Sequence, residues 1–457
     1  MIIPRSRLSA TADSTKITTP TDGDSEHSNT ILPVDRPIHD WYRFVLSFPP
    51  HLVRKYIQAF GLTSEHTVLD PFCGTGTTLV ECRKERVHSF GVEAHPMAYL
   101  ASRVKTNWSL DTALLSRLLK KICQSIACEI VTEGLPLLSL QLRMTCETRA
   151  QYRIPIELSD DEERLIPEGF VSPKPLRRLL AVRRCVETHT NLYDQDVRDF
   201  FFLALAHCIV NGAGNFAFGP EIYRVKPKDD YDVEGHFARQ AQLMLYELKK
   251  AQRELAPFAE CAVVQGDART LDTVPDGGAD ALITSPPYPN EKDYTRTTRV
   301  ESVLLRLVTS RRDLRAVKSL LLRSNTRNVF VDDNDEEWVK DCPEIRRICE
   351  RIEQRRTELN KTSGFERLYY KVVGHYFGGM ARHFTALCSK IKRGAKCAYV
   401  VGDQLSFLMV PVPTAKLLGV IAERHGFRQI GCDLWRSRFG TKSKTYVREE
   451  ILLLERR

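Results

Sequence analysis

A short apolar stretch and the glycine-containing turn after it decide the fold: HTVLD at 66–70 leads directly into PFCGTGTT at 71–78. An apolar run that ends in a carboxylate is typical of a buried parallel strand. Gly74 and Gly76 permit a tight turn and a close approach of the backbone to a ligand. The next residues, LVECRKER at 79–86, have helical character. The sequence therefore predicts a strand, a turn and a helix, the unit of a doubly wound α/β sheet.

The same alternation of strand and helix recurs along the chain. Further strands are predicted at SFGVE (89–93), CAVVQGD (261–267), DALITSPPY (280–288), AKCAYVVGD (395–403) and the closing REEILLLERR (448–457). Helices are predicted at HLVRKYIQAF (51–60), HPMAYLASRVKTN (95–107) and about 414–425. In such a sheet, ligands bind at the carboxyl ends of the strands, where the motifs of this chain stand.

The rhythm of predicted elements also divides the chain into segments. Residues 1–35 are rich in Thr, Ser, Asp and Pro, so we expect a disordered tail. Residues 36–107 and 259–457 form the two parts of the α/β domain. Between them, residues 108–258 are mostly helical in pattern and too long for one crossover, which predicts a helical insertion. A basic, helix-like segment at about 295–361 lies in the second part; its acidic patch, DDNDEE (332–337), is expected to be a solvated loop rather than a metal site.

Composition narrows the class of protein. Of the 457 residues, 42% are hydrophobic, which suffices for a sizeable core, and a formal net charge of +9 mildly favours a polyanionic partner. The 13 cysteines are scattered without a C-x-x-C pair, so neither a zinc ribbon nor another metal site is predicted. No apolar run reaches the roughly 18 residues that span a bilayer. We therefore expect a cytoplasmic protein that does not enter a membrane.

Two motifs carry the chemistry. Glu93 ends the second strand, where an acid can bind the two hydroxyls of a ribose. The glycine turn lacks the following G-K-[ST] of a phosphate-binding loop, and its leading acid and proline disfavour a nicotinamide dinucleotide. In TSPPY (284–288), consecutive prolines cannot continue a strand and present Ser285 and Tyr288 at the edge of the sheet. A hydroxyl, a free carbonyl and an aromatic ring suit a planar base with an exocyclic amine.

Taken together, DPFCGTGTT, GVEAHPMA, VVQGDA and TSPPY resemble the motif set of the DNA amino-methyltransferases. FPPHLVRKYIQAFGLTSEHTVLDPF (48–72) also resembles the segment that closes over the cofactor in that family. The resemblance covers about 45–105, 260–300 and 365–457. It implies a Rossmann-like, seven-stranded class I methyltransferase sheet, S-adenosyl-L-methionine as the cofactor and a flipped-out DNA base as the substrate.

The resemblance also implies a role for each matching residue. The glycine turn would hold the methionine part of the cofactor, Glu93 its ribose and Asp267 its adenine amine. The implied cofactor-binding residues are Asp70, Phe72, Gly74, Gly76, Thr77, Glu93, Asp267 and Ala268. The implied catalytic loop consists of Ser285, Pro286, Pro287 and Tyr288. His95 either starts the next helix or touches the edge of the cofactor.

The identity of the target base rests on Ser285. Serine at the first position of the loop is typical of cytosine-N4 enzymes in this family, whereas Asp or Asn is typical of adenine-N6 enzymes. We therefore expect a site-specific cytosine-N4 methyltransferase, with adenine N6 as the alternative. A role in restriction-modification, in phage defence or in regulation is left open by the sequence. An RNA guanine-N2 methyltransferase and a catalytically silent DNA-binding scaffold also stay open.

Arginines that follow the catalytic loop are the expected phosphate contacts in DNA. They are Arg296, Arg299, Arg311, Arg312 and Arg315. Solvated helical faces are the competing interpretation. A cognate restriction or defence protein as a further partner is left open by the sequence.

Overall fold

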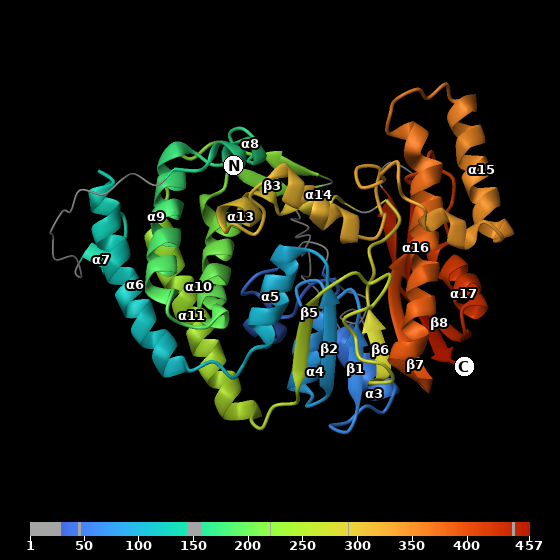
Figure 1. Ribbon diagram of the computed structural model, residues 1–457, viewed down its shortest axis with the longest axis horizontal. Helices are drawn as coiled ribbons and strands as arrows, with labels where there is room; N and C mark the ends of the chain where they lie inside the picture. Colours follow the sequence, from blue (N-terminus) through green and yellow to red (C-terminus); the bar gives the residue numbers. More distant parts are fainter. Residues whose placement is uncertain (1–28, 44–46, 144–156, 220, 291, 441–443) are drawn as a thin grey trace, which may run out of the picture.

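The computed structural model describes residues 29–43, 47–143, 157–219, 221–290, 292–440 and 444–457 (Figure 1). Most of the expected tail, residues 1–28, lies outside the described residues. The short helices η1 (Pro33–Asp35) and α2 (Arg36–His39) stand at and just after the expected boundary at residue 35. The buried Asp35 accepts a hydrogen bond from Arg54 at 2.9 Å, so the structured chain includes the last residues of the expected tail.

A seven-stranded sheet forms the centre of the molecule, in the order β5-β2-β1-β6-β7-β9-β8. Its strands are β1 (Thr67–Asp70), β2 (His88–Glu93), β5 (Cys261–Gln265), β6 (Ala279–Thr284), β7 (Ile391–Gly402), β8 (Phe427–Gly440) and β9 (Thr445–Arg456). From β5 to β7 the neighbours pair in parallel, whereas β9 runs antiparallel to both β7 and β8. The predicted Rossmann-like, mostly parallel sheet is thereby confirmed.

Apolar side chains on both faces of the sheet explain why its central strands have continuous apolar sequences. Val68 of β1 packs into a cluster with α3 (Pro50–Ala59), and the adjacent Leu69 packs into a cluster with α16 (Tyr369–Lys390) and α17 (Thr414–Arg424). Both β1 side chains are fully buried. Helices α4 (Thr77–Lys84) and α5 (Pro96–Thr106) follow β1 and β2.

Strand β8 is absent from the strands that the sequence predicts. Its sequence, FRQIGCDLWRSRFG, mixes Arg, Gln and Asp with apolar residues, and of the latter Phe427 and Trp435 are buried. Register shifts at Gln429/Gly431 and at Leu434/Arg436 break the alternation of inward and outward side chains. Because the strand forms largely by pairing with β9, its sequence lacks the apolar run that marks the central strands.

Helices make up most of the described part of 108–258, beside the β5 edge of the sheet (Figure 1). The helices are α6 (Thr112–Thr132), α7 (Leu140–Arg143), α8 (Asp160–Leu165), α9 (Pro173–Thr190), α10 (Gln195–Cys208), the π-helical η2 (Ile209–Ala213) and α11 (Val233–Leu255). Except for α8, whose Leu165 packs against Val303, Val308 and Val317, they share one apolar core with α5. A small antiparallel pair of strands, β3 (Phe216–Phe218) and β4 (Ile222–Arg224), adds to the helical pattern that the sequence predicts.

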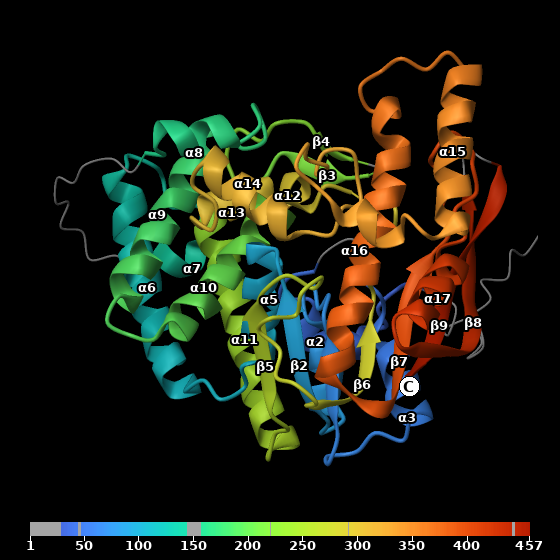
Figure 2. The same cartoon turned by 45° about the vertical axis from the view of Figure 1, so that its right-hand side comes forward.

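The segment between β6 and β7 is helical and covers the carboxyl end of the sheet (Figure 2). Its helices are α12 (Tyr294–Thr297), α13 (Arg299–Leu304), α14 (Arg311–Leu320), η3 (Asp335–Val339), α15 (Pro343–Glu358) and η4 (Glu366–Leu368), followed by α16. Within the described ranges, no helix combines the length and the apolar character that a membrane span needs.

Candidate active site

A cleft opens at the carboxyl ends of β1, β2, β5 and β6, where the predicted motifs meet. Its empty volume, including the open mouth, is about 940 Å³. The predicted residues in its lining are Phe72, Gly74, Thr77, Glu93, Ala268, Ser285 and Pro287. The other predicted site residues of the two motif groups, Asp70, Gly76, Asp267, Pro286 and Tyr288, lie outside this lining.

Several lining residues were not predicted as site residues. They are, among others, Tyr42, Tyr294, Thr298 and the run Leu320, Leu321 and Leu322. Phe48, also in the lining, begins the segment whose resemblance implies closure over the cofactor. Tyr42 donates its hydroxyl to the buried carboxylate of Glu301 at 2.8 Å, which ties the N-terminal segment to α13. No local sequence pattern marks these residues, because they come from ends of elements that are far apart in the chain.

The glycine turn has the backbone conformation that its sequence predicts. Gly74 and Gly76 have φ values of 54° and 86°, in the left-handed region that favours glycine. A Cβ on Gly76 would lie 3.1 Å from the Cα of Ser102, so Gly76 allows α5 to pack against the turn. A Cβ on Gly74 would meet nothing closer than the Phe72 carbonyl oxygen at 4.0 Å. Gly74 therefore leaves open space on the cleft side of the turn.

Glu93 organises the wall of the cleft next to the turn. Its carboxylate accepts the backbone N–H of Gly74 at 2.8 Å and that of His95 at 2.7 Å. Burial raises the pKa of Glu93 to about 7. His95 starts α5 by accepting the Met97 N–H at its Nδ1, and its Nε2 lies 3.1 Å from the Thr298 hydroxyl. His95 thus caps a helix and lines the cleft at the same time.

Asp70 connects the glycine turn with the predicted catalytic loop. Its Oδ1 accepts the Phe72 N–H at 3.1 Å and the hydroxyl of Thr284, the residue before Ser285, at 2.6 Å. Burial raises the pKa of Asp70 to about 6. The carboxyl group is completely buried, so Asp70 joins two loops instead of facing the cleft.

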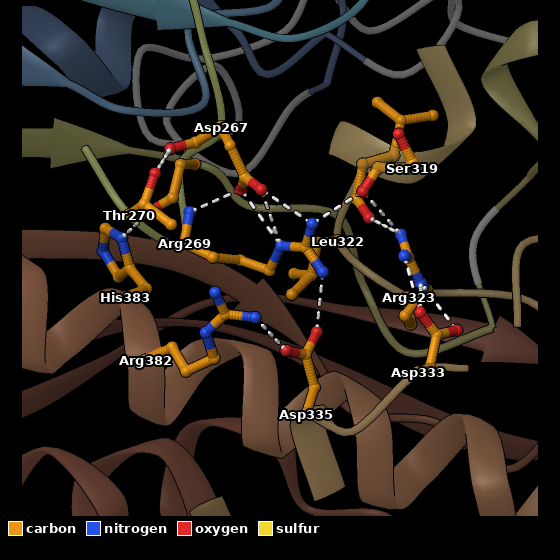
Figure 3. A network of polar contacts seen from close by, with 12 residues as sticks. Asp267, Arg269, Thr270, Ser319, Leu322, Arg323, Asp333, Asp335, Arg382 and His383 are labelled. Atoms are coloured by element: carbon orange, nitrogen blue, oxygen red, sulfur yellow. Dashed lines mark hydrogen bonds and ion pairs between the residues drawn. The ribbon is translucent and has the colours of Figure 1, made fainter. Parts of the chain in front are cut away.

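Asp267 is held by an arginine that the sequence analysis did not single out (Figure 3). Arg269 donates through Nε to Oδ1 of Asp267 at 3.0 Å and through Nη2 to Oδ2 at 2.7 Å. The same guanidinium donates to Asp335 at 2.7 Å and to the Ser319 carbonyl at 2.7 Å. Arg382 also pairs with Asp335. The structure therefore places the predicted adenine ligand in a buried network of ion pairs.

The acidic patch at 332–337 is solvated only in part: Asp332, Glu336 and Glu337 are exposed as predicted, whereas Asp333 and Asp335 are paired with arginines. Asp335 is buried against Arg269, and Asp333 accepts two hydrogen bonds from Arg323. Pairing with arginines compensates for the burial of these carboxylates. A run of acids looks solvated in sequence because its partners lie in distant parts of the chain.

The two buried arginines of Figure 3 also fix one wall of the cleft. Arg269 donates to the Ser319 carbonyl, and Arg323 donates to the carbonyls of Lys318 and Ser319 and to that of Leu321. These carbonyls end α14, where positive charge is favourable. The arginines thereby hold the run 320–322 against the cleft.

The catalytic loop lies between the ends of β6 and β7. Ser285 donates its hydroxyl to the Val400 carbonyl at 3.1 Å, and Ser285 and Pro287 face the cleft. The half-buried Tyr288 packs on the backbone of Gly402, where an added Cβ would lie 2.7 Å from Cε2 of the ring. The loop therefore brings Ser285 to the cleft and Tyr288 to the end of β7.

The five predicted DNA-contacting arginines have different surroundings. Arg296 pairs with Glu221, next to β4, at 3.1 Å. Arg299 is half-buried and donates to the Thr295 carbonyl at 2.8 Å. The remaining three, Arg311, Arg312 and Arg315, are exposed on α14. Arg315 lies over the Phe330 ring, 5.5 Å from its centroid. The α14 arginines are nevertheless exposed to a partner, whereas Arg296 and Arg299 are bound within the protein.

A mostly parallel sheet with a reversed β9, and a cleft beside its glycine turn, are consistent with a Rossmann-like methyltransferase fold. Comparison with known proteins agrees: a family model described as DNA methylase matches residues 16–102. The Type II methyltransferase M.BsoBI of Geobacillus stearothermophilus is 24% identical over 430 residues, which cover 90% of this chain and 82% of that protein. The Type II methyltransferases M.AvaI of Nostoc sp. and Anabaena variabilis are each 21% identical over 420 residues, covering 86% of this chain and 79% of theirs. These similarities support the predicted resemblance to the DNA amino-methyltransferase family.

Proposed function

We propose that the protein transfers a methyl group from S-adenosyl-L-methionine to the N4 amine of a flipped-out cytosine in DNA. The observation that carries the proposal is the hydrogen bond of Ser285 to the Val400 carbonyl, made where Ser285 lines the same cleft as Glu93. This bond engages the hydroxyl proton, so the oxygen can only accept hydrogen bonds from a ligand. An exocyclic amine is a donor of the required kind, and serine at this position favours cytosine.

The residues around the cleft fit the cofactor. Glu93 presents a carboxylate that can accept the ribose hydroxyls, since each of its oxygens has a second lone pair. The open space beside Gly74 would receive the methionine part. Ala268 and Phe72 would flank the adenine. Asp267 would bind the adenine amine with a carboxylate that is already paired with Arg269. When bound there, S-adenosyl-L-methionine supplies an electrophilic methyl group.

The catalytic loop would activate the amine through its geometry. The lone pair of cytosine N4 is delocalised into the ring, so the amine is a weak nucleophile. Hydrogen bonds from N4–H to the Ser285 oxygen and the Pro286 carbonyl would favour a tetrahedral nitrogen with a localised lone pair. Pro287 keeps the loop stiff, and Tyr288 would stack on the base.

No strong general base is needed for this reaction. The methylated nitrogen is acidic and loses its extra proton to Ser285 or to water. The expected contribution of the protein is therefore mainly the positioning of donor and acceptor.

Mass spectrometry of nucleosides tests the proposal directly. DNA from cells that express the wild-type protein should contain N4-methylcytosine, and the Ser285→Ala variant should yield much less. N6-methyladenine as the only product would show that Ser285 does not mark cytosine, and adenine N6 would replace the proposed target. Methylated guanine in RNA with no modified DNA would refute DNA as the substrate. A protein that binds the cofactor and modifies neither would be a silent scaffold.

The Type II names of the three relatives support a role in restriction-modification. DNA is then the macromolecular substrate of the chain. We expect the exposed α14 arginines to contact its phosphates.

A further inference from the structure

Strands β8 and β9 continue past the rest of the sheet as a two-stranded ribbon. Pairing of β9 with β7 ends at Gly402↔Glu449, whereas pairing with β8 extends to Gly440↔Thr445. We call residues 436–440 and 444–448 the ribbon end. Since β8 runs in the direction of the central strands, the ribbon end projects from the edge of the sheet that carries the cleft (Figure 2).

The base of the ribbon end touches the catalytic loop. A Cβ on Gly402 would lie 2.7 Å from the Tyr288 ring and 3.3 Å from Cγ of Glu449, so both side chains meet at this glycine. Glu449 pairs with Arg436 at 2.5 Å and with Arg438 at 3.5 Å. The two arginines therefore lie on the ribbon face that adjoins the residue proposed to stack on the target base.

The ribbon end combines positive charge with exposed aromatic rings. Residues 436–448 contain no Asp or Glu. The side chains of Arg438 and Arg448 are 53% and 58% exposed, and Lys444 is exposed as well. Phe439 and Tyr446, 52% and 71% exposed, contact each other with ring centroids 5.4 Å apart. The two rings form a cross-strand pair that stabilises the ribbon, and they remain exposed outside every apolar cluster of the described chain, where a partner can reach them.

The ribbon end and α14 lie at opposite sides of the catalytic loop. Val317 of α14 lines one pocket together with Gln265 of β5, and β5 is one edge strand of the sheet. The ribbon end belongs to β8, the other edge strand. The loop follows β6, which stands between them. A molecule that contacts both basic surfaces therefore passes over the catalytic loop.

We infer that the ribbon end is a DNA-contact surface, which binds duplex DNA on the β8 side of the target base. This inference rests on DNA as the substrate in the proposed function. The register places Arg438 on the face that adjoins Tyr288, and Arg448 with the Phe439–Tyr446 pair on the opposite face. With the ribbon end inserted in a groove, Arg438 and Arg448 would bind phosphates on its two sides, Lys444 would bind them at the turn, and the ring pair would lie against sugars and base edges. A two-stranded ribbon has a width that the major groove accepts. Charge complementarity selects this partner, because the ribbon end is cationic and DNA is a dense polyanion.

Salt dependence of DNA affinity tests the surface in the full-length protein. In one variant Arg438, Lys444 and Arg448 are all replaced by Gln, and its binding to a mixed-sequence duplex is measured by fluorescence anisotropy over a range of salt. Each lost phosphate contact lowers the slope of log affinity against log salt by about 0.9, so we expect a decrease of about 2 to 3. Calorimetric affinity for the cofactor should stay at the wild-type value, which also shows that the variant is folded.

A matched control removes three positive charges from the amino end of the sheet, the end away from the cleft. Arg86, Lys392 and Arg393 are exposed near the amino ends of the strands, and their replacement by Gln should leave the slope unchanged. A second variant, Tyr446→Ala, should weaken DNA binding without a change of slope, because the ring carries no charge.

Two results would overturn the inference, and they differ from each other. If the ribbon variant binds and methylates DNA with the wild-type slope of log affinity against log salt, the ribbon end is not a DNA surface. The proposed function would then remain intact. Absence of DNA binding by the wild-type protein would refute the proposed function and the surface together. The competing occupant of the ribbon end is a second copy of the chain, which sedimentation would reveal. If the wild-type protein is a dimer and the ribbon variant is a monomer with an unchanged salt slope, the ribbon end is a dimer interface.

Discussion

Ionisation of Glu93 should control cofactor affinity near neutral pH. Burial raises the pKa of Glu93 to about 7, so the side chain is about one-tenth ionised at pH 6 and about nine-tenths ionised at pH 8. A carboxylate accepts hydroxyl hydrogen bonds better than a neutral carboxyl group does. The affinity should therefore rise about tenfold between these pH values, in proportion to the ionised fraction. Nearby groups titrate lower, since the pKa of Asp70 is raised to about 6 and that of His95 is lowered to about 4.

The stability of the free protein should change in the opposite direction. The folded-state pKa of Glu93 lies above the ordinary value of 4.5, so the folded state binds more protons than the unfolded state between pH 4.5 and about 7. This contribution to stability is complete below the unfolded pKa and is lost as the pH rises through about 7. Rising affinity and falling stability in one pH window would together identify a buried carboxyl group that binds ligand in its charged form.

Calorimetric titration with the demethylated cofactor product, at constant ionic strength across this pH range, measures the effect. Glu93→Gln keeps one acceptor oxygen but cannot ionise, so its affinity should be lower by about 1.5–3 kcal/mol at high pH and should not vary with pH. Asp403→Asn is the matched control: burial raises the pKa of Asp403 to about 6, but it lies outside the cleft lining and holds the Thr414 N–H. The reasoning fails if Glu93→Gln retains the wild-type pH profile or if Asp403→Asn abolishes it.

Three further outcomes are expected. Arg269→Met removes the cation shared by Asp335 and the partly buried Asp267, although Asp335 keeps Arg382, and should lower the free energy of unfolding by about 3 kcal/mol; an unchanged urea midpoint would contradict the ion-pair network. Gly402→Ala places a Cβ against the Tyr288 ring, so methylation should fall while calorimetric cofactor affinity persists, and wild-type turnover would argue against this packing. Replacement of the three α14 arginines by Gln should flatten the salt dependence of DNA binding; a constant slope would remove α14 from the DNA surface.

The parts of the fold that the sequence predicts are those whose cause is local. Val68 and Leu69 are buried on opposite faces of β1, and such two-sided burial demands a continuous apolar run that is visible in the sequence. Strand β8 lies at the edge, and its two register shifts interrupt the pattern. Its existence depends on β9, which no window of sequence around residues 427–440 reveals.

The same distinction separates the predicted site residues from the others. Gly74 and Glu93 stand at the ends of successive strands, so a local pattern locates both at the cleft. The partners of Asp267 are set by tertiary structure: Arg269 reaches Asp335, 66 positions further on. Paired charges of this kind leave no periodic signal, and the acidic patch therefore resembles a surface loop. The wall at 320–322 depends on that pairing and was missed for the same reason.

The 2.6 Å hydrogen bond from Thr284 to Asp70 joins two segments that lie 214 positions apart in the chain. It ties the glycine turn to the start of the predicted catalytic loop, so the places proposed for methyl donor and acceptor are held next to each other when the protein folds. On the proposed function, no domain closure would be needed to bring these two segments together. The conformational change before each reaction would then lie in the DNA, whose target base would leave the helix and enter a site that is already in order.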